Sequence, residues 1–375
     1  MNDPRLQQLA DTILDHSLKV KSGERVLISW DGPEAMPLIQ TLISDVITRG
    51  ALPLWYYDPE NFLQRFLTNA NEEQIKSFGE AQLQYLKTAQ AFIGIRGNDN
   101  AFELQEVFPE RLQWYGKHYR KPRFEYMSQI RWVAMRYPSS FMAQLAQVST
   151  ESFTDFYFKT VLIDYAKLRE AMLPLKRLME KTDEVRIVSP RTDLRFSIKN
   201  IPVIACDGTL NLPDGEVFTA PVRDSINGTI LFNASTPYQG KAFQNIHLTF
   251  KEGKIVEARC DNNTKGLNDI LNTDEGSRYV GEFAIAFHPW IRTPMNDALF
   301  DEKIAGSLHF ALGKCYDEAS NGNKSAIHWD IVHIQRKDFG GGEIYFDGKL
   351  IRKDGAFALS ELQGLNPETW GAPAC

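Results

Sequence analysis

The residues best suited to chemistry lie near the C-terminal end of the chain, in the run Ser-Ala-Ile-His-Trp-Asp-Ile-Val over residues 325–332. Apolar residues alternate there with His328 and Asp330, a period-two pattern that is typical of a β-strand. Such a strand presents an imidazole and a carboxylate on the same face. Because charged groups are rarely buried without a partner or a metal ion, the pair predicts half of a metal site. A simple hydrogen-bonded pair is the alternative interpretation.

Three further acidic or imidazole residues interrupt apolar runs in the second half of the chain. They are Glu216 in Leu-Pro-Asp-Gly-Glu-Val-Phe, Glu282 in Gly-Glu-Phe-Ala-Ile and His309 in Leu-His-Phe-Ala-Leu. Histidine and carboxylate together form a ligand set suited to Zn, Mn, Co or Fe. Each residue alone also fits a structural role, as a salt-bridged edge glutamate or a satisfied core histidine. Together with the histidine–aspartate pair, the five donors predict a metal site.

Three other residues near these donors are open to both structural and functional interpretations. Tyr316 follows soon after His309 and fits a packing aromatic as well as a residue of the site. His333 falls on the opposite strand face from His328, so we expect a structural role for it. His288 precedes a proline and is expected to be a loop residue.

The two halves of the chain, which must position these residues, differ in their predicted pattern of secondary structure. Residues 1–183 alternate amphipathic helices, such as 33–49, with short apolar strands, such as 25–30, and predict an α/β N-terminal doubly wound domain that ends in a helical linker. No Gly-x-Gly-x-x-Gly follows the first strand, so a dinucleotide site is not supported. Residues 184–375 are rich in short strands and turns, including Asp347-Gly348, and predict an α+β C-terminal metal-binding domain that is catalytic.

Composition and charge exclude several classes of protein. The chain has 375 residues and a formal net charge of −6, so it carries no basic field for nucleic acid. No apolar run approaches the roughly 18–20 residues needed to cross a membrane, and the N-terminus lacks the pattern of a signal peptide. Four scattered cysteines form no Cys-x-x-Cys pair. These features predict a cytoplasmic protein with reduced thiols.

Four motifs in this order resemble those of the thermophilic aminopeptidase family of metallopeptidases, the aminopeptidase T and aminopeptidase S type. They occupy residues 213–221, 281–285, 309–313 with Tyr316, and 323–330, with looser similarity at 22–28 and 94–98. The resemblance implies a two-domain homodimer with two divalent metal ions (Zn, Co or Mn) in its C-terminal domain. It also implies a ligand set and a nearby tyrosine: Glu216, Glu282, His309, His328 and Asp330, with Tyr316 close to the metals. Residues 286–291 depart from the family pattern, which has a more open turn there.

The resemblance implies hydrolysis of the N-terminal bond of peptide substrates by an activated water. In such a mechanism Glu282 would be shared by the two cations, Tyr316 would hydrogen-bond to the developing oxyanion, and Glu216 would carry a proton to the leaving amine.

A rival interpretation uses His309, His328 and Asp330 alone, as the two-histidine-one-carboxylate set of mononuclear Fe(II) chemistry. Ring-cleaving dihydroxypyridine dioxygenases, which resemble the same family, use that triad. A mononuclear iron site needs neither Glu216 nor Glu282, and both stand in the aminopeptidase pattern. The sequence therefore favours the aminopeptidase.

Overall fold

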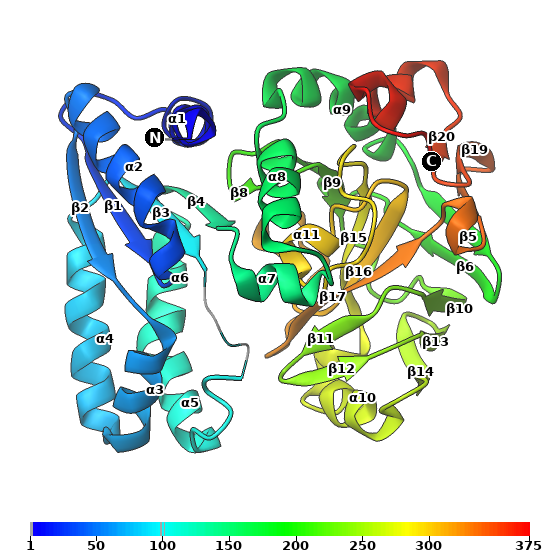
Figure 1. Cartoon of the computed structure of the whole chain (residues 1–375). Coiled ribbons are helices and arrows are strands. Elements are labelled where there is room, and N and C mark those ends of the chain that lie inside the picture. The colour runs from blue at the N-terminus through cyan, green and yellow to red at the C-terminus, as the bar shows by residue number, and fades with distance from the viewer. Residues whose placement is uncertain (1–2, 98–99, 101) are drawn as a thin grey trace. The chain divides into compact units, whose positions relative to one another are not determined.

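The computed structural model describes residues 3–97, 100 and 102–375, and the chain divides into two compact units (Figure 1). The first unit runs to Ile163 and also takes Gly208–Leu212; the second takes Asp164–Asp207 and Pro213–Cys375. Residues 1–2 of the predicted first domain and Asn98 of the motif at 94–98 lie outside the described residues. Among the described residues, no helix combines the length and apolar character that a membrane span requires.

The boundary between the units differs in detail from the expected one between residues 183 and 184. Helix α9 (Tyr165–Met179) packs against strands β7 (Ile204–Cys206) and β9 (Glu216–Thr219), so it belongs to the second unit. The short strand β8 (Asn211–Leu212) belongs to the first unit, because it pairs in parallel with the last long strand of that unit's sheet.

The first unit is built on a parallel sheet with the strand order β2-β1-β3-β4-β8. Its long strands are β1 (Arg25–Trp30), β2 (Leu52–Tyr57), β3 (Ala91–Arg96) and β4 (Arg131–Arg136). Strand β1 is buried at all but its first residue, as expected for a parallel strand covered on both faces. The parallel sheet of the predicted α/β domain is therefore present in this unit.

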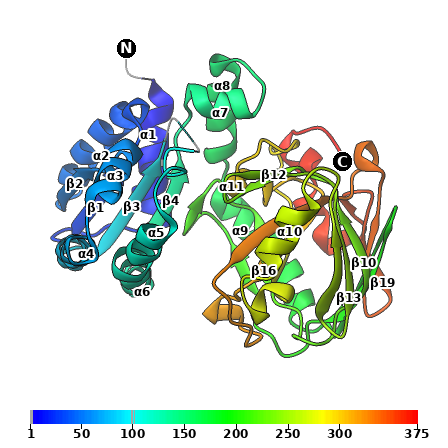
Figure 2. The same ribbon diagram turned by 90° about the horizontal axis from the view of Figure 1, so that it is seen from below.

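Helices cover this sheet on both faces, and Figure 2 shows α1 and α2 on one side of it and α4 to α6 on the other. The helices of the unit are α1 (Pro4–Asp11), α2 (Met36–Thr48), α3 (Glu60–Asn69), α4 (Glu72–Lys87), α5 (Pro109–Tyr115), α6 (Lys121–Met127), α7 (Ser140–Leu145) and α8 (Thr150–Val161). Leu27 and Phe92 of the sheet share one core cluster with Leu86 of α4.

The second unit is dominated by antiparallel sheet, as predicted for its α+β texture. An eight-stranded sheet has the order β14-β13-β10-β6-β5-β18-β19-β20. Its strands are β5 (Glu184–Ser189), β6 (Thr192–Ser197), β10 (Asn227–Phe232), β13 (Ile246–Lys251), β14 (Lys254–Arg259), β18 (Glu343–Phe346), β19 (Lys349–Lys353) and β20 (Ala356–Phe357). Asp347 and Gly348 both adopt positive φ between β18 and β19, which confirms the predicted hairpin turn.

A five-stranded antiparallel sheet, with the order β17-β16-β15-β9-β7, carries the candidate site. Its three long strands are β15 (Val280–Ala286), β16 (Ser307–Gly313) and β17 (His328–Ile334), and β15 and β16 are buried along their whole length. A two-stranded ribbon, β11 (Thr236–Tyr238) with β12 (Lys241–Phe243), and the helices α10 (Thr264–Leu271) and α11 (Ala298–Asp301) complete the unit.

Candidate metal centre

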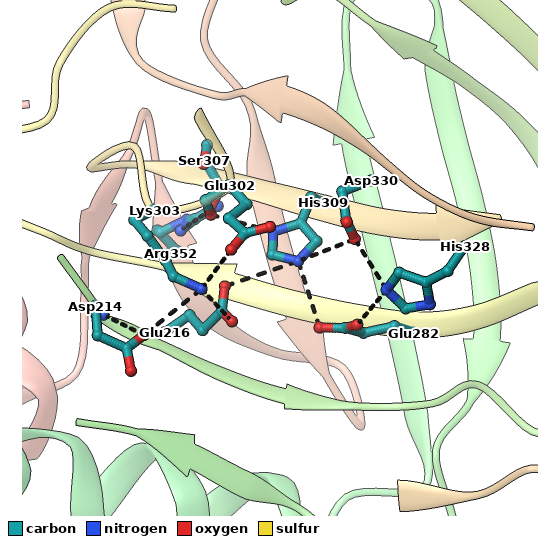
Figure 3. A network of polar contacts seen from close by, with 11 residues as sticks. Asp214, Glu216, Glu282, Glu302, Lys303, Ser307, His309, His328, Asp330 and Arg352 are labelled. Carbon is teal, nitrogen blue, oxygen red and sulfur yellow. Dashed lines mark hydrogen bonds and ion pairs between the residues drawn. The ribbon is translucent and has the colours of Figure 1, made fainter. Parts of the chain in front are cut away.

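Four neighbouring strands bring the five predicted donors to one face of the five-stranded sheet (Figure 3). Glu216 begins β9, Glu282 lies on β15, His309 on β16, and His328 with Asp330 on β17. In an antiparallel sheet, directly opposed residues share a face, and the register extends this face across the strands. The structure thus groups side chains that lie up to 114 positions apart in the sequence.

Small residues separate the donors on this face and leave room between them. Ala311 lies opposite both Glu282 and Asp330, and Ala284 lies opposite His309. The other face of the same strands carries large aromatics instead, such as Phe283 and Phe310, whose ring centroids lie 5.7 Å apart. One face is therefore packed as core, whereas the other holds polar groups around a space.

A β-bulge at Gly281 places Glu282 in this row. The register between β15 and β16 shifts between Val280 and Glu282, so that Glu282 rather than Gly281 lies opposite Ala311. A Cβ atom at position 281 would lie 2.4 Å from the carbonyl oxygen of Lys314 and 2.5 Å from that of Gly313. Only glycine fits this close approach of two backbones, which explains the Gly-Glu pair in the sequence.

The spacing of the donor atoms suits a shared cation better than hydrogen bonds. His309 Nε2 lies 3.4 Å from Glu282 Oε1, 3.7 Å from Glu216 Oε2 and 3.9 Å from Asp330 Oδ1. Charge-assisted N–H···O hydrogen bonds are shorter, at about 2.7–2.9 Å. Ligands that each lie about 2.1 Å from a tetrahedral ion are about 3.4 Å from one another.

The second histidine has the same geometry. His328 Nε2 lies 3.4 Å from Glu282 Oε2 and 3.6 Å from Asp330 Oδ1. Both His328 Nε2 and Glu216 Oε2 are buried without a hydrogen-bond partner. Buried polar atoms normally have partners, so these two point to a group that binds both nitrogen and oxygen. A divalent cation meets that requirement.

Backbone carbonyls fix the orientation of both imidazoles. His309 Nδ1 lies 3.1 Å from the carbonyl oxygen of Glu302, and His328 Nδ1 lies 2.7 Å from that of Lys314. Since a carbonyl only accepts, each Nδ1 carries the proton and donates it. The Nε2 lone pairs are then directed into the site, which is the arrangement of metal-binding histidines.

Lys303 and Glu302 belong to the site, although the sequence analysis missed them. The buried Lys303 Nζ lies 2.6 Å from Glu216 Oε1, 2.8 Å from Glu302 Oε1 and 3.5 Å from Asp214 Oδ1. The lysine therefore holds Glu216 by one oxygen and leaves the other toward His309. The sequence carries no signal for this role, because the run Asp301-Glu302-Lys303 resembles a solvated segment, whereas Asp301 and Lys303 are buried in the structure.

The remaining residues near the donors have different surroundings. Tyr316 follows β16, and its ring packs on His328 and Phe218, with centroid distances of 4.7 Å and 5.6 Å. It is therefore both a packing aromatic and a neighbour of the site. The buried His333 contacts the carbonyl oxygen of Leu231 and the hydroxyl of Ser189, so its predicted structural role is confirmed.

In the metal-free site, carboxylates surround the two imidazoles and favour their protonated, cationic form. Although burial opposes the charged imidazole, Glu216 and Glu282 raise the pKa of His309 to about 9, and Asp330 and Glu282 raise that of His328 to about 10. These pKa values keep both rings protonated at neutral pH when no metal is bound.

The carboxylates of the site differ in the direction of their pKa shifts. Burial raises the pKa of Glu216 to about 8 against the opposing effects of Lys303 and His309, and burial likewise raises the pKa of Asp330 to about 6. Glu282 behaves oppositely, because its contacts with His309 and His328 outweigh burial and lower its pKa to about 2. Glu282 is thus held in its charged form by two imidazoles.

The donor atoms fall into overlapping groups whose members all lie within 4.8 Å of one another. One group joins Glu216, Glu282 and His309, and another joins Glu282, His328 and Asp330. Glu282 belongs to both groups through different oxygens. Nitrogen and carboxylate donors at this spacing suit Zn²⁺, Co²⁺ or Mn²⁺.

The structure thus combines a candidate site for divalent cations, on an antiparallel sheet, with an α/β unit built on a parallel sheet. The chain matches the family described as thermophilic metalloprotease (M29) over residues 2–357, and it belongs to this family.

Individual relatives are named as aminopeptidases. The chain is 32% identical over 163 residues to aminopeptidase 2 of Geobacillus stearothermophilus and 34% identical over 155 residues to aminopeptidase T of Thermus thermophilus. These matches cover 39% and 37% of this chain, and each spans only 37% of the relative's length. Aminopeptidase PepS of Streptococcus thermophilus is 25% identical, with 94% of this chain and 95% of that protein covered.

A solved structure shares the fold. The structure of AmpT from Thermus thermophilus aligns with a TM-score of 0.80 at 22% identity and covers 95% of this chain and 99% of that chain. This likeness supports the mixed architecture of a parallel sheet and antiparallel sheets.

Proposed function

We propose that this protein is a metal-dependent aminopeptidase that hydrolyses the N-terminal bond of peptides with a water activated by two divalent cations, Zn²⁺, Co²⁺ or Mn²⁺. The observation that carries the proposal is the position of Glu282. Its two oxygens lie 3.4 Å from the Nε2 atoms of two different histidines, so one carboxylate serves two groups of donors. The family membership and the aminopeptidase relatives support the same reaction class.

Five residues would hold the cations: Glu216, Glu282 and His309 on one side, and Glu282, His328 and Asp330 on the other. Bound there, the cations would supply a nucleophile from water at neutral pH and polarise the scissile carbonyl. A mononuclear iron site would leave Glu216 and Glu282 without a role, so the donor set gives no support to the dioxygenase alternative.

The chain's own residues would orient the reactants and move the proton. Lys303 holds Glu216 by Oε1. The oxygen of Glu216 that is not bound to a cation would carry a proton to the leaving amine. Tyr316 lies against His328, and its hydroxyl would donate a hydrogen bond to the developing oxyanion.

An assay of metal-stripped protein tests this proposal. Co²⁺, Zn²⁺, Mn²⁺ or Fe²⁺ is added in turn, with an unblocked peptide and its N-acetylated twin as substrates. We expect release of the first residue from the unblocked peptide only. Glu282→Ala should abolish this release and lower the metal content, whereas Glu257→Gln, a change at an exposed glutamate of β14, should alter neither. Full activity of Glu282→Ala would refute the assignment.

Two further parts of the proposal rest on the sequence and on the family resemblance. We propose that the protein is a homodimer and that it acts in the cytoplasm. Light scattering after size-exclusion chromatography measures the first, and fractionation of the source cells measures the second.

A further inference from the structure

A fourth carboxylate reaches the metal centre without belonging to the expected ligand set. Glu302 follows α11, and its side chain is 14% exposed, whereas those of Glu216 and Glu282 are 6% and 4% exposed. One oxygen of Glu302 lies 2.8 Å from Lys303 Nζ, which anchors the group. A carboxylate oxygen of Glu302 also lies within 4.8 Å of donor atoms of both His309 and Asp330. Glu302 is therefore both fixed in place and open to a ligand.

A small cavity adjoins this carboxylate. The volume that the centre of a water-sized group can occupy in this cavity is about 10 Å³, so the cavity has space for one such group. Its lining combines three acidic residues, two hydroxyl residues and apolar surface: Asp301, Glu302, Asp330, Ser235, Thr236, Pro237, Ala298 and Val332. Three acidic residues and two hydroxyls around a space of this size suit a small cation that donates several hydrogen bonds.

We propose that Glu302 binds the free α-ammonium group of the peptide substrate and so determines that the enzyme cleaves only at unblocked N-termini. This inference rests on the proposed aminopeptidase function. An ammonium group is about the size of a water molecule and offers three N–H donors. Glu302 supplies one acceptor, and Asp330 supplies another, because both histidine contacts of Asp330 go to Oδ1 and leave Oδ2.

A blocked N-terminus fails at this cavity for two reasons. An acetylated amine carries no charge, so it forms no charge-assisted hydrogen bond with Glu302. The acetyl group is also larger than the single water-sized group for which the cavity has space. Asp330 belongs both to the lining of this cavity and to the metal centre. An amine bound in the cavity is therefore also held at a fixed distance from the metal centre.

The test compares a substrate that carries a free amine with an analogue that lacks it. The substrates are leucine p-nitroanilide and its des-amino analogue, 4-methylpentanoyl p-nitroanilide, and the variants are Glu302→Gln and, as a matched control at an exposed glutamate, Glu361→Gln. In Glu302→Gln we expect KM for leucine p-nitroanilide to rise roughly 10- to 100-fold, the loss of one charge-assisted hydrogen bond. KM for the analogue, which has no amine to recognise, should change far less, and bound metal should stay at the wild-type level. The control should alter none of these values.

Ala298→Val provides a second variant that leaves Glu302 intact and changes an exposed position. The added methyl groups would narrow the cavity, so we expect KM to rise for the free amine alone. Loss of metal in Glu302→Gln would overturn the proposal by making Glu302 a ligand. An unchanged preference for the free amine in both variants would also overturn it, while aminopeptidase activity of the wild type would leave the proposed function standing. A wild-type enzyme that releases nothing with any metal would overturn both.

Discussion

Metal binding at neutral pH is expected to displace protons from the two histidines of the site. An imidazole binds a cation only through a free Nε2 lone pair. Without metal, the pKa values of His309 and His328 are about 9 and about 10, so both rings are protonated at pH 7. Full loading must release these two protons, and a third from Glu216, whose pKa is about 8.

This release makes the metal affinity steeply dependent on pH. Each displaced proton raises the apparent affinity by about tenfold per pH unit, so two imidazole protons give about 100-fold per unit in the overall constant for loading both cations between pH 6 and pH 8. The contribution of Glu216 adds to the slope below its pKa of about 8 and disappears above it. An ordinary surface cluster of histidines, with pKa values near 6.5, would show almost no slope above pH 7.

Isothermal titration calorimetry counts these protons. Zn²⁺ is titrated into metal-stripped protein at pH 7 in two buffers with different enthalpies of ionisation, and the difference in the observed heat gives the number of protons released. We expect two to three protons per chain. His328→Ala should release at least one fewer, whereas His247→Asn, a change at a histidine of β13 outside the site, should leave the number unchanged. A count below one in the wild type would refute the reasoning.

Three further predictions concern stability and the shape of the site. The pKa of His309 is raised above its unfolded value of about 6.5, so its contribution to the stability of the metal-free protein is complete below pH 6.5 and is lost as pH rises toward 9. Thermal melts without metal should therefore show Tm falling over this pH range. A Tm that stays constant would contradict this prediction. Lys303→Met leaves buried carboxylates without their cation, so urea titrations should show a loss of about 3–5 kcal/mol, and a smaller loss with bound metal. Gly281→Ala should weaken Zn²⁺ binding and lower Tm, because the new Cβ would displace the bulge at Glu282, whereas Gly116→Ala, where a Cβ meets nothing within 4 Å, should do neither.

The sequence predicted those parts of the fold whose signals are local. Strand β1 occurs at the predicted residues 25–30, because it is a short apolar run bounded by turns. Strand β4 has no such signal, since arginines begin and end it and only alternate residues are buried. The apolar spacing over residues 4–22 is typical of one amphipathic helix, but α1 ends at Asp11 and continues as a π-helical turn to Ser17. Neither period nor propensity reveals such a change of winding.

The residues of the candidate site also include some with a local sequence signal and some without one. The five donors could be found because each interrupts an apolar strand, where an imidazole or carboxylate needs a physical reason to be buried. Lys303 could not be found, because it stands in a run of charged residues that resembles a solvated helix end. Its partner Glu216 lies 87 residues away, and only the tertiary fold brings the two together. The cavity beside Glu302 likewise depends on β11 and β17, which no local pattern connects.

The balance of charge at the site favours two cations over one. Five carboxylates gather there, those of Asp214, Glu216, Glu282, Glu302 and Asp330, and Lys303 neutralises one of them. Two divalent ions would neutralise the remaining four negative charges, whereas one would leave two of them buried and uncompensated, at a high cost in desolvation. In the metal-free protein, protons on the two imidazoles and on Glu216 take the place of the missing charge. The surrounding carboxylates raise the pKa values of the imidazoles, and burial raises that of Glu216. The protons and the metal ions therefore compete for the same atoms. A site for a single iron bound by His309, His328 and Asp330 would not need the carboxylate of Glu282 that both histidines share.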